Sequence, residues 1–441
     1  MRLKHLILFP VLCFTVFSCK EEKPIEISSN DYHNAVDKLT QVMIHDIFSP
    51  PVASRIYAYP NIAAYETLNQ NNASYRSLNG QLNDLTLNPP ENADVPNLKL
   101  ASIVAYLDVA KELVFSKDSI TKYRDSLYKE WDDINSKEFN IAKSYGREIS
   151  QQIIAWMNKD NYAETRTMPD YNIYTNDPSQ WEPTPPAYMK GIEPHWNKIR
   201  PFVLDSAAQF KPKKHPKFSL EEGSAFYQEL IDVYNVTNNI RAKGDNCEEI
   251  QIARFWDCNP FVSVNKGHFM FAEKKITPGA HWIGICKIAC KDTNSDYQKT
   301  IFAYTKTSIA IADAFISCWD EKYRSNLIRP ETLINKHIDT DWSPILQTPP
   351  FPEYTSGHSV VSGASSEALT DIFGDNFSFD DTTELPYGLP MRRFKSFRLA
   401  AQEAAVSRLY GSIHYKAAVE VGVEQGIGVG NLVNSKLEFL K

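Results

Sequence analysis

The stretch SDYQKTIFAYTKTSIAIADAFISCWDEKYRSNLI, residues 295–328, decides the fold class of this chain. It has the apolar spacing of a helix and is longer than a usual globular helix. The segments 98–115, 138–157 and 219–234 repeat the same helical spacing, whereas no comparable segment alternates with a period of two. We therefore predict an all-α protein.

The helical pattern lapses in the middle of the chain, where prolines and aromatic residues are frequent. A loop of this length inside a compact domain is usually functional or separates two units. We therefore predict two helical bundles packed together, residues 30–165 and 219–441, joined by an ordered crossover over 166–218. Ser219 and Glu222 have the spacing of a capping box, so the second bundle should open with a helix there.

The composition is that of an ordinary globular protein, with 441 residues, 43% hydrophobic residues and 23% charged residues. The formal net charge of −7 argues against a nucleic-acid-binding protein, which would favour a basic face. Glycine is scarce, at 17 residues, which argues against an all-β sandwich with many tight turns.

The N-terminus has the features of a targeting segment. Two basic residues precede a short apolar run that ends in Ser18-Cys19, an arrangement that resembles a bacterial lipoprotein signal. Cleavage would remove residues 1–18, lipidate Cys19 and leave a tether over 19–29. This predicts an exported protein on the outer membrane or cell surface, with the lipid on Cys19 as its membrane contact. A plain secretory signal, giving a periplasmic or secreted protein, is the alternative.

Five cysteines follow Cys19, and none of them belongs to a C-x-x-C pair. That spacing would have pointed to zinc or redox chemistry. An exported protein can carry a disulfide, and the spacing leaves its pairing open.

Three short blocks in the second half carry groups that bind anions. In the first, KYRSNLIRP, Lys322 and Arg329 are seven residues apart and would lie on one helix face. Pro330 disfavours helix at the preceding residue, so we expect Arg329 at the helix end. The alternative is a solvated basic face that also includes Arg324.

The second block is PFPEYTSGHSVV, residues 350–361. If Thr355 or Ser356 caps a helix, the amides of Gly357 and His358 are unpaired first-turn donors that can bind an anion. Ser356 adds a hydroxyl group, and His358 adds an acid–base group that titrates near neutral pH. The alternative is an ordinary N-cap followed by an unrelated histidine.

The third block is SRLYGSIHYKAA, residues 407–418. On one continuous helix Arg408 and His414 would point in different directions, because they are six residues apart. We interpret Gly411-Ser412 as the end of one helix and the N-cap of the next, which places His414 in the first turn of the new helix. The alternative is a core histidine. Together the three blocks suit a tetrahedral oxyanion with one histidine bonded to its central atom.

These blocks, Lys-x6-Arg-Pro, Ser-Gly-His and Ser-Arg-x5-His in that order, resemble the signature of the type 2 phosphatidic acid phosphatase superfamily. That superfamily includes bacterial class A acid phosphatases and vanadium-dependent haloperoxidases. The stretches 50–66 and 252–282 resemble the bacterial haloperoxidase branch and extend the similarity over most of the chain. The overall pattern is most similar to flavobacterial vanadium iodoperoxidases.

The resemblance implies one vanadate per chain, bonded to His414 as the metal ligand. It implies that the vanadate oxygens are held by a set of five further groups: Lys322, Arg329, Arg408, Ser356 and the Gly357 amide. His358 would assist proton transfers, and Lys322 would polarise the bound peroxide. Trp319 and Phe351 match aromatic positions that line the vanadate pocket in chloroperoxidase relatives.

The expected reaction oxidises halide with hydrogen peroxide to hypohalous acid, through a peroxovanadate on the histidine. Iodide or bromide is favoured over chloride, since they are easier to oxidise. An organic acceptor can then react with the hypohalous acid. One alternative is an acid phosphatase in which His414 attacks phosphorus and His358 protonates the leaving group. The superfamily often has an aspartate four residues after this histidine, and here that position is Ala418, which weakens the phosphatase reading. A non-catalytic oxyanion-binding lipoprotein is the other alternative, and it gives no reason for both histidines.

Overall fold

The computed structural model describes residues 23–70, 72–90, 96–174, 176–260, 263–266, 269–272 and 274–441. The signal peptide and the lipidation site at Cys19 lie outside these residues and stay predictions. The helices of the first half are α1 Ser29–Asp46, α2 Pro50–Asn69, α3 Leu98–Leu113, α4 Lys117–Met157, α5 Tyr162–Thr165 and the 3-10 turn η1 Trp196–Lys198. The helices of the second half are α6 Ala225–Lys243, α7 Glu248–Phe255, α8 Pro278–Asp292, α9 Tyr297–Ser325, α10 Pro330–His337, α11 Gly357–Phe373, the 3-10 turn η2 Leu385–Tyr387, α12 Phe397–Tyr410 and α13 Lys416–Lys436.

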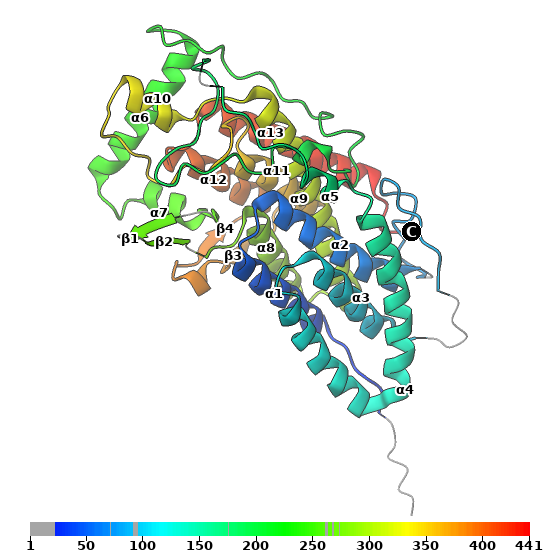
Figure 1. Cartoon of the computed structure of the whole chain (residues 1–441). Helices are drawn as coiled ribbons and strands as arrows, with labels where there is room; N and C mark the ends of the chain where they lie inside the picture. The colour runs from blue at the N-terminus through cyan, green and yellow to red at the C-terminus, as the bar shows by residue number, and fades with distance from the viewer. Residues whose placement is uncertain are drawn as a thin grey trace, which may run out of the picture.

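The fold is helical as predicted, and the described strands form two short antiparallel hairpins (Figure 1). Strands β1 Ser263–Lys266 and β2 Phe269–Ala272 form one hairpin, and β3 Phe379–Asp381 and β4 Arg392–Phe394 form the other. The β3–β4 hairpin contributes Phe379 and Phe394 to the edge of the helical core. The all-α prediction is therefore confirmed.

Helix α9, the helix predicted from residues 295–328, is the central element of the fold. Asp296 caps its N-terminus by accepting the Lys299 amide at 2.7 Å, and Asn326 ends it in the left-handed conformation, with φ 49°. Among the described helices it alone is long and apolar enough to cross a bilayer, but its most apolar window is entirely buried inside the protein. It packs against α2 on one side and against α8, α11 and α13 on others.

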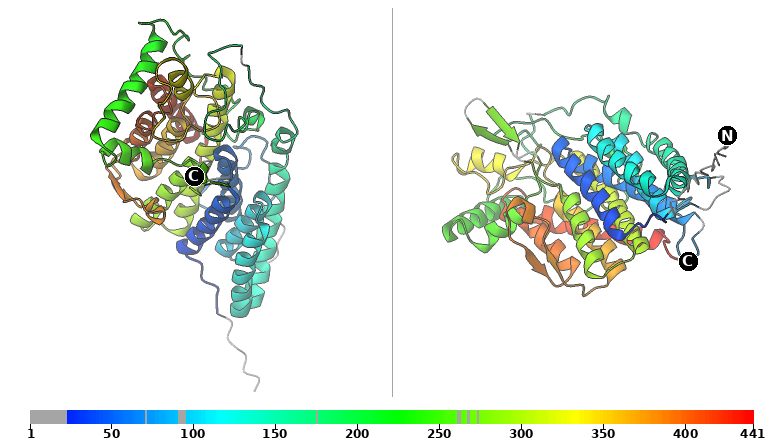
Figure 2. Two further views of the ribbon diagram at one scale, coloured as in Figure 1. Left: turned by 60° about the vertical axis from the view of Figure 1, so that its left-hand side comes forward. Right: turned by 90° about the horizontal axis from the view of Figure 1, so that it is seen from below.

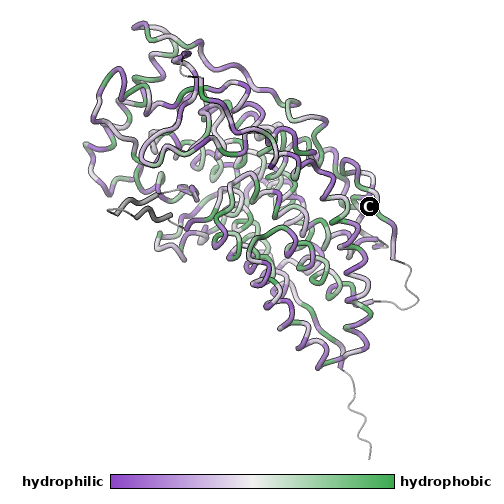
Figure 3. The backbone as a smooth tube through the Cα atoms, in the orientation of Figure 1, coloured by the Kyte–Doolittle hydropathy of each residue, from purple (hydrophilic) through white to green (hydrophobic). Residues whose placement is uncertain are grey.

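The two groups of helices lie side by side, with α9 between them (Figure 2). They share one hydrophobic core that runs from Tyr32 in α1 and Ile62 in α2 through α9 to Val429 in α13. Along the outer helices hydrophobic and hydrophilic residues alternate, as expected for helices with one face in a core (Figure 3). Burial of this shared apolar surface is the main force that holds the two halves together.

The crossover between the two halves packs onto the core, mostly without regular secondary structure. Its aromatic residues Trp181, Trp196 and Phe202 are buried. Buried Asp313 of α9 accepts three consecutive backbone N–H groups of the crossover, those of residues 202–204, at 2.7, 2.7 and 3.0 Å. One carboxylate therefore satisfies amides that would otherwise be buried without a partner.

Helices α11 and α13 approach so closely that glycine is required between them. A Cβ on Gly426 would lie 2.1 Å from the Val360 carbonyl oxygen. This contact brings the first turn of α11 to the first turn of α13, where the Ser356 amide donates to the Ala418 carbonyl at 3.1 Å. The two helix starts that carry the second and third sequence blocks are thereby set beside each other.

Two local predictions need correction or completion. Helix α6 begins at Ala225 with Ser224 as its N-cap, whose hydroxyl accepts the Tyr227 amide at 3.2 Å, so the predicted start at Ser219 is wrong. The five cysteines in the described part of the chain are all free thiols, so no disulfide forms among them.

Candidate active site

Ser356 is the N-cap of α11, as the sequence predicts. Its hydroxyl accepts the Ser359 amide at 3.3 Å and keeps its own proton available for donation. Gly357 is the first residue of the helix, where backbone N–H groups have no partner within the helix. A Cβ on Gly357 would meet only the Trp319 ring, at 3.6 and 4.0 Å, so packing against the protein does not demand glycine here.

Lys322 lies in the last turn of α9 and is fully buried. Its ammonium group donates to the carbonyls of Pro352, Glu353 and Thr355 at 3.0, 3.0 and 2.5 Å. An ammonium group has three donors, so a contact with an anion would replace one of these bonds. Burial lowers the pKa of Lys322 to about 7, with Arg329 as a further cause.

Arg329 does not sit at the end of the Lys322 helix. Helix α9 ends at Ser325, because Asn326 turns the chain, and Arg329 is instead the N-cap of α10. Its guanidinium is buried and donates to the carbonyls of Phe351 and Ile413 at 2.9 and 2.8 Å. The two cations therefore come from different elements rather than from one helix face.

Arg408, in the last turn of α12, and His358, in the first turn of α11, both hydrogen-bond to the backbone of Trp256. The Trp256 carbonyl accepts Arg408 Nη1 at 3.1 Å, and the backbone of Trp256 also hydrogen-bonds to the His358 ring. His358 Nε2 is buried without a hydrogen-bond partner, so the bond to Trp256 uses the other ring nitrogen. Burial lowers the pKa of His358 well below 6.5, and Arg408 lowers it further.

His414 lies just before α13, not in its first turn. The turn after α12 places Ser412, rather than Gly411, in the left-handed conformation, with φ 63°, and α13 begins only at Lys416. The His414 Nε2 atom lies 3.2 Å from Arg329 Nη1. Burial lowers the pKa of His414 well below 6.5, and Arg329, Lys322 and Arg408 add to the shift. The ring is therefore neutral at neutral pH, the form that binds a metal.

Glu353 is the residue that orients His414, and the sequence analysis missed it. Its Oε1 atom lies 2.8 Å from His414 Nδ1 and accepts the Tyr415 amide at 2.9 Å. A proton on Nδ1, donated to Glu353, leaves the Nε2 lone pair for a ligand. Burial raises the pKa of Glu353 to about 8, although Arg329 and Lys322 oppose the shift. The signal was present: Glu353 is the acidic residue within the apolar and small stretch PFPEYTSGH.

Six of the nine predicted residues line one pocket. They are Trp319, Phe351, Gly357, His358, Arg408 and His414, joined there by Pro50, Cys258, Asn259, Pro278, Phe315 and Pro349. The other three adjoin it: Ser356 precedes Gly357, Arg329 contacts His414, and Lys322 lies 4.9 Å from the centre of the Phe351 ring. Pro50, at the start of α2, shows that the N-terminal half also contributes to the wall.

The aromatic wall of the pocket carries cationic neighbours. The Trp319 and Phe351 rings are 5.0 Å apart and tilted by 53°. Lys322 and Arg329 both lie over the Phe351 ring, at 4.9 and 5.1 Å. Cation–π contacts of this kind hold the side chains in place without using their hydrogen-bond donors.

The pocket has an excess of buried positive charge and of unpaired donors. Burial lowers the pKa of Arg329 to about 10 and lowers that of Arg408. Arg329 Nη2 and Arg408 Nε are buried and have no hydrogen-bond partner in the described residues. The nearest carboxylate oxygen to Arg408 is that of Asp257, at 3.9 Å. A buried guanidinium N–H without an acceptor lowers the stability of the fold, so these unpaired donors fit a tetrahedral oxyanion such as vanadate.

The chain is similar to known proteins in sequence and in fold. A family model described as the VCPO second helical-bundle domain matches residues 302–440. The crystal structure of a bacterial vanadium-dependent iodoperoxidase is 62% identical, with a TM-score of 0.92, over 96% of this chain and 99% of that one. A holo-type bacterial vanadium-dependent chloroperoxidase is 16% identical, with a TM-score of 0.65, over 89% of this chain and 93% of that one. An apo-type bacterial vanadium-dependent chloroperoxidase is 15% identical, with a TM-score of 0.65, over 91% of this chain and 97% of that one. The comparison with curated proteins gives no match.

The chain belongs to the vanadium-dependent haloperoxidase family. The resemblance inferred from sequence is therefore confirmed, and so is the enzyme class, a haloperoxidase that depends on vanadium. The chloroperoxidases share the fold, and at their level of identity they support nothing finer.

The argument from Ala418 against a phosphatase loses its force. Ala418 is buried where its carbonyl accepts the Ser356 amide, and Glu353 supplies the carboxylate partner of His414 instead. A carboxylate thus orients the histidine from a different place in the sequence. The choice between haloperoxidase and phosphatase rests on the 62% identical iodoperoxidase, not on this position.

Proposed function

We propose that this enzyme oxidises iodide with hydrogen peroxide to hypoiodous acid, with vanadate bound in the pocket between α9, α11 and the His414 turn. The proposed ligand to vanadium is His414 Nε2. Arg329, Arg408, Ser356 and the Gly357 amide would hold the oxygens, and their charge would balance the anion. When bound, vanadate supplies the activation of hydrogen peroxide toward halide.

The observation that carries the proposal is the set of unpaired buried donors around a neutral histidine. The Arg329 Nη2 and Arg408 Nε donors have no partner among the described residues, and neither has His358 Nε2, which carries the lone pair of the neutral ring. An anion of tetrahedral shape would give the two guanidinium groups acceptors and would offset the burial that lowers their pKa values. The same anion would stabilise a proton on His358.

His358 is the proposed proton carrier. The overall reaction, X⁻ + H₂O₂ + H⁺ → HOX + H₂O, takes up one proton for each halide that is oxidised. His358 Nε2 is buried in the pocket wall, without a partner, while the bond to Trp256 holds the ring. It can take a proton from entering peroxide and return it to the departing oxygen.

The role proposed for Lys322 is electrostatic. Its ammonium group is held by three carbonyls beside the Phe351 ring, so its charge acts on the pocket from a fixed position. Vanadate would favour the protonated form of Lys322, whose pKa burial lowers to about 7. Trp319 and Phe351 would exclude water from the halide side of the pocket.

The preference for iodide is proposed from the 62% identical relative, whose crystal structure is that of an iodoperoxidase. Iodide is also the easiest of the three halides to oxidise, and bromide is the second candidate. The test is to load the full chain with vanadate and to measure peroxide-dependent oxidation of iodide, bromide and chloride in parallel. The proposal expects iodide to have the highest kcat/KM, and His414→Ala to abolish both vanadate binding and turnover.

The same preparation tests the phosphatase alternative with an aryl phosphate ester in the absence of vanadate. Ester cleavage by the vanadate-free chain, combined with no halide oxidation by the loaded chain, would overturn the proposal. Full vanadate affinity in His414→Ala would overturn the ligand assignment alone.

A further inference from the structure

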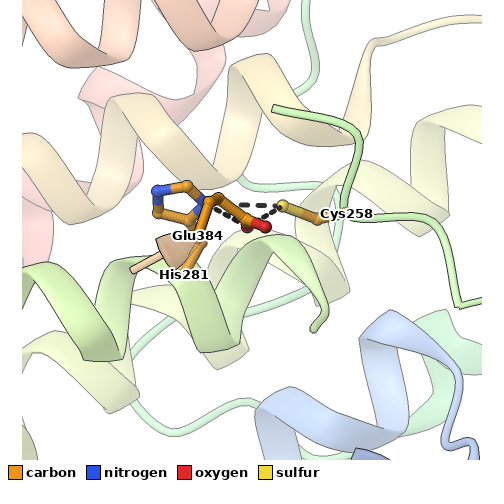
Figure 4. Close-up of side chains that lie close together, drawn as sticks. All are labelled: Cys258, His281 and Glu384. Carbon is orange, nitrogen blue, oxygen red and sulfur yellow. Dashed lines mark hydrogen bonds and ion pairs between the residues drawn. The ribbon is translucent and has the colours of Figure 1, made fainter. Parts of the chain in front are cut away.

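Behind the pocket wall, three side chains from distant segments converge (Figure 4). Cys258 follows α7, His281 lies in the first turn of α8, and Glu384 precedes η2. All three are buried, and one atom of each lies within 4.8 Å of the others. None of them belongs to the nine residues that the sequence blocks predict.

The three atoms have the separations of ligands around one metal ion. Cys258 Sγ and His281 Nδ1 are 3.5 Å apart, His281 Nδ1 and Glu384 Oε1 are 3.2 Å apart, and Cys258 Sγ and Glu384 Oε1 are 3.9 Å apart. A tetrahedral zinc ion, at about 2.3 Å from sulfur and about 2.1 Å from nitrogen and oxygen, would place these pairs about 3.6, 3.4 and 3.6 Å apart. The observed distances agree to within a few tenths of an ångström.

A second layer of contacts fixes the histidine in the required orientation. His281 Nε2 lies 2.8 Å from Asp381 Oδ2 and 2.7 Å from Thr383 Oγ1. The Trp256 ring stacks on the imidazole at 4.4 Å, with the planes 21° apart. A carboxylate on one ring nitrogen and a ligand position on the other is the usual arrangement of metal-bound histidine.

We propose that Cys258 Sγ, His281 Nδ1 and Glu384 Oε1 bind one divalent transition-metal ion of the zinc class, with water as the fourth ligand. A thiolate, an imidazole and a carboxylate around a tetrahedral position form the donor set that such ions favour over magnesium or calcium. This site shares Cys258 with the wall of the vanadate pocket but uses none of the nine residues that the sequence blocks predict, and it does not depend on the halide that the enzyme oxidises.

The ion would strengthen one wall of the active site. Cys258 also lines the vanadate pocket, and Trp256, two residues before it, supports both Arg408 and His358. A metal bound to Cys258 would tie this segment to α8 and to the loop before η2. It would also hold Cys258, which lines the pocket, as a metal-bound thiolate.

Binding of the ion would release protons from its cysteine and histidine ligands. The Cys258 thiol loses its proton to solvent, because the bound form is the thiolate. The His281 imidazole must likewise carry no proton on Nδ1 when that atom binds the ion. The apparent affinity for the ion should therefore rise as the pH rises.

The test uses the full chain loaded with vanadate, so that the pocket histidines are occupied. The protein is first stripped with a chelator, then loaded with vanadate, and finally titrated with Co²⁺, which takes zinc positions and reports thiolate ligation by a near-ultraviolet charge-transfer band. We expect about one cobalt per chain with this band. X-ray absorption at the cobalt edge should show one sulfur at about 2.3 Å. A spectrum with nitrogen and oxygen neighbours only would overturn the proposal.

Variants assign the ligands. Cys258→Ser and Glu384→Gln should each weaken cobalt binding about 100-fold or more, and Cys258→Ser should abolish the charge-transfer band. Cys290→Ser is the matched control, because it removes another buried thiol of the same region, on the helix that carries His281. A band that survives in Cys258→Ser, or disappears in Cys290→Ser, would overturn the assignment. Circular dichroism checks that each variant is folded. If a variant does not fold, the X-ray absorption measurement on the unaltered chain still tests the proposal.

Discussion

Replacing Glu353 by alanine tests how the pocket orients His414, the proposed metal ligand. The change removes the acceptor for both His414 Nδ1 and the Tyr415 amide, which lie 2.8 and 2.9 Å from Oε1. Without this acceptor the imidazole can place its proton on either nitrogen, and the tautomer with Nε2 protonated cannot bind vanadium. Loss of such an outer partner costs about 10–100-fold in metal affinity. That range corresponds to about 1.4–2.8 kcal/mol, since 1.4 kcal/mol is a factor of ten.

Glutamine at the same position separates hydrogen bonding from charge. Its amide oxygen can still accept from His414 Nδ1 and from the Tyr415 amide, so the histidine keeps its tautomer. We expect Glu353→Gln to change vanadate affinity less than tenfold, and Glu353→Ala to fall within the 10–100-fold range. Vanadate dissociation constants from isothermal titration calorimetry on the vanadate-free chain distinguish these results.

The matched control is Glu66→Ala, which removes another fully buried glutamate, on α2. Glu66 accepts hydrogen bonds from Leu78 N, at 2.7 Å, and from Gln70 Nε2, at 2.9 Å, and neither residue lies in the pocket. Its loss should lower the free energy of unfolding and leave vanadate affinity unchanged. If Glu353→Ala binds vanadate within twofold of the unaltered chain, the proposed orientation of His414 is refuted.

Three further outcomes follow from the same contacts. His358→Ala should keep vanadate affinity within about threefold and lower kcat for iodide oxidation at least about 100-fold; full turnover would remove its role as proton carrier. The vanadate-free chain should lose stability as pH rises from about 4.5 to about 8, because burial raises the pKa of Glu353 from 4.5 to about 8 and the fold holds a proton that the unfolded chain releases. In urea unfolding, Glu353→Gln should flatten that slope by up to about 1.4 kcal/mol per pH unit, and an unchanged slope would contradict the buried proton. Gly426→Ala, whose Cβ would lie 2.1 Å from the Val360 carbonyl, should lower the free energy of unfolding by about 3 kcal/mol, and a wild-type melting temperature would refute the close contact.

The sequence predicted the position of a helix wherever residues adjacent in the chain determine where it begins and runs. The apolar spacing of residues 295–328 predicted the central helix, and Ser356 before Gly357 predicted the start of α11. The start of α6 was missed, because two equally good serine caps, Ser219 and Ser224, lie five residues apart and only packing of the helix selects between them.

The turns next to the site were harder to predict than the helices. A continuous helix from Lys322 to Arg329 is consistent with the spacing, yet Asn326 adopts a left-handed conformation and ends α9. Ser412 rather than Gly411 takes the left-handed position before His414. Asparagine adopts this conformation readily, so Asn326 was a helix-stop signal that the spacing argument overlooked. Serine reaches it only at a cost that tertiary contacts must offset, so Gly411 was the better choice from sequence.

By itself, the sequence determined the helical class and named the residues that gather in and beside one pocket, because the three blocks keep the spacing of a known signature. Only the tertiary structure decided which carboxylate orients His414, since Glu353 lies 61 residues before it. The cluster of Cys258, His281 and Glu384 was equally invisible, because its members lie on three segments without any metal-binding spacing. Such contacts form where helices pack, and their partners are set by the geometry of the shared core rather than by distance along the chain.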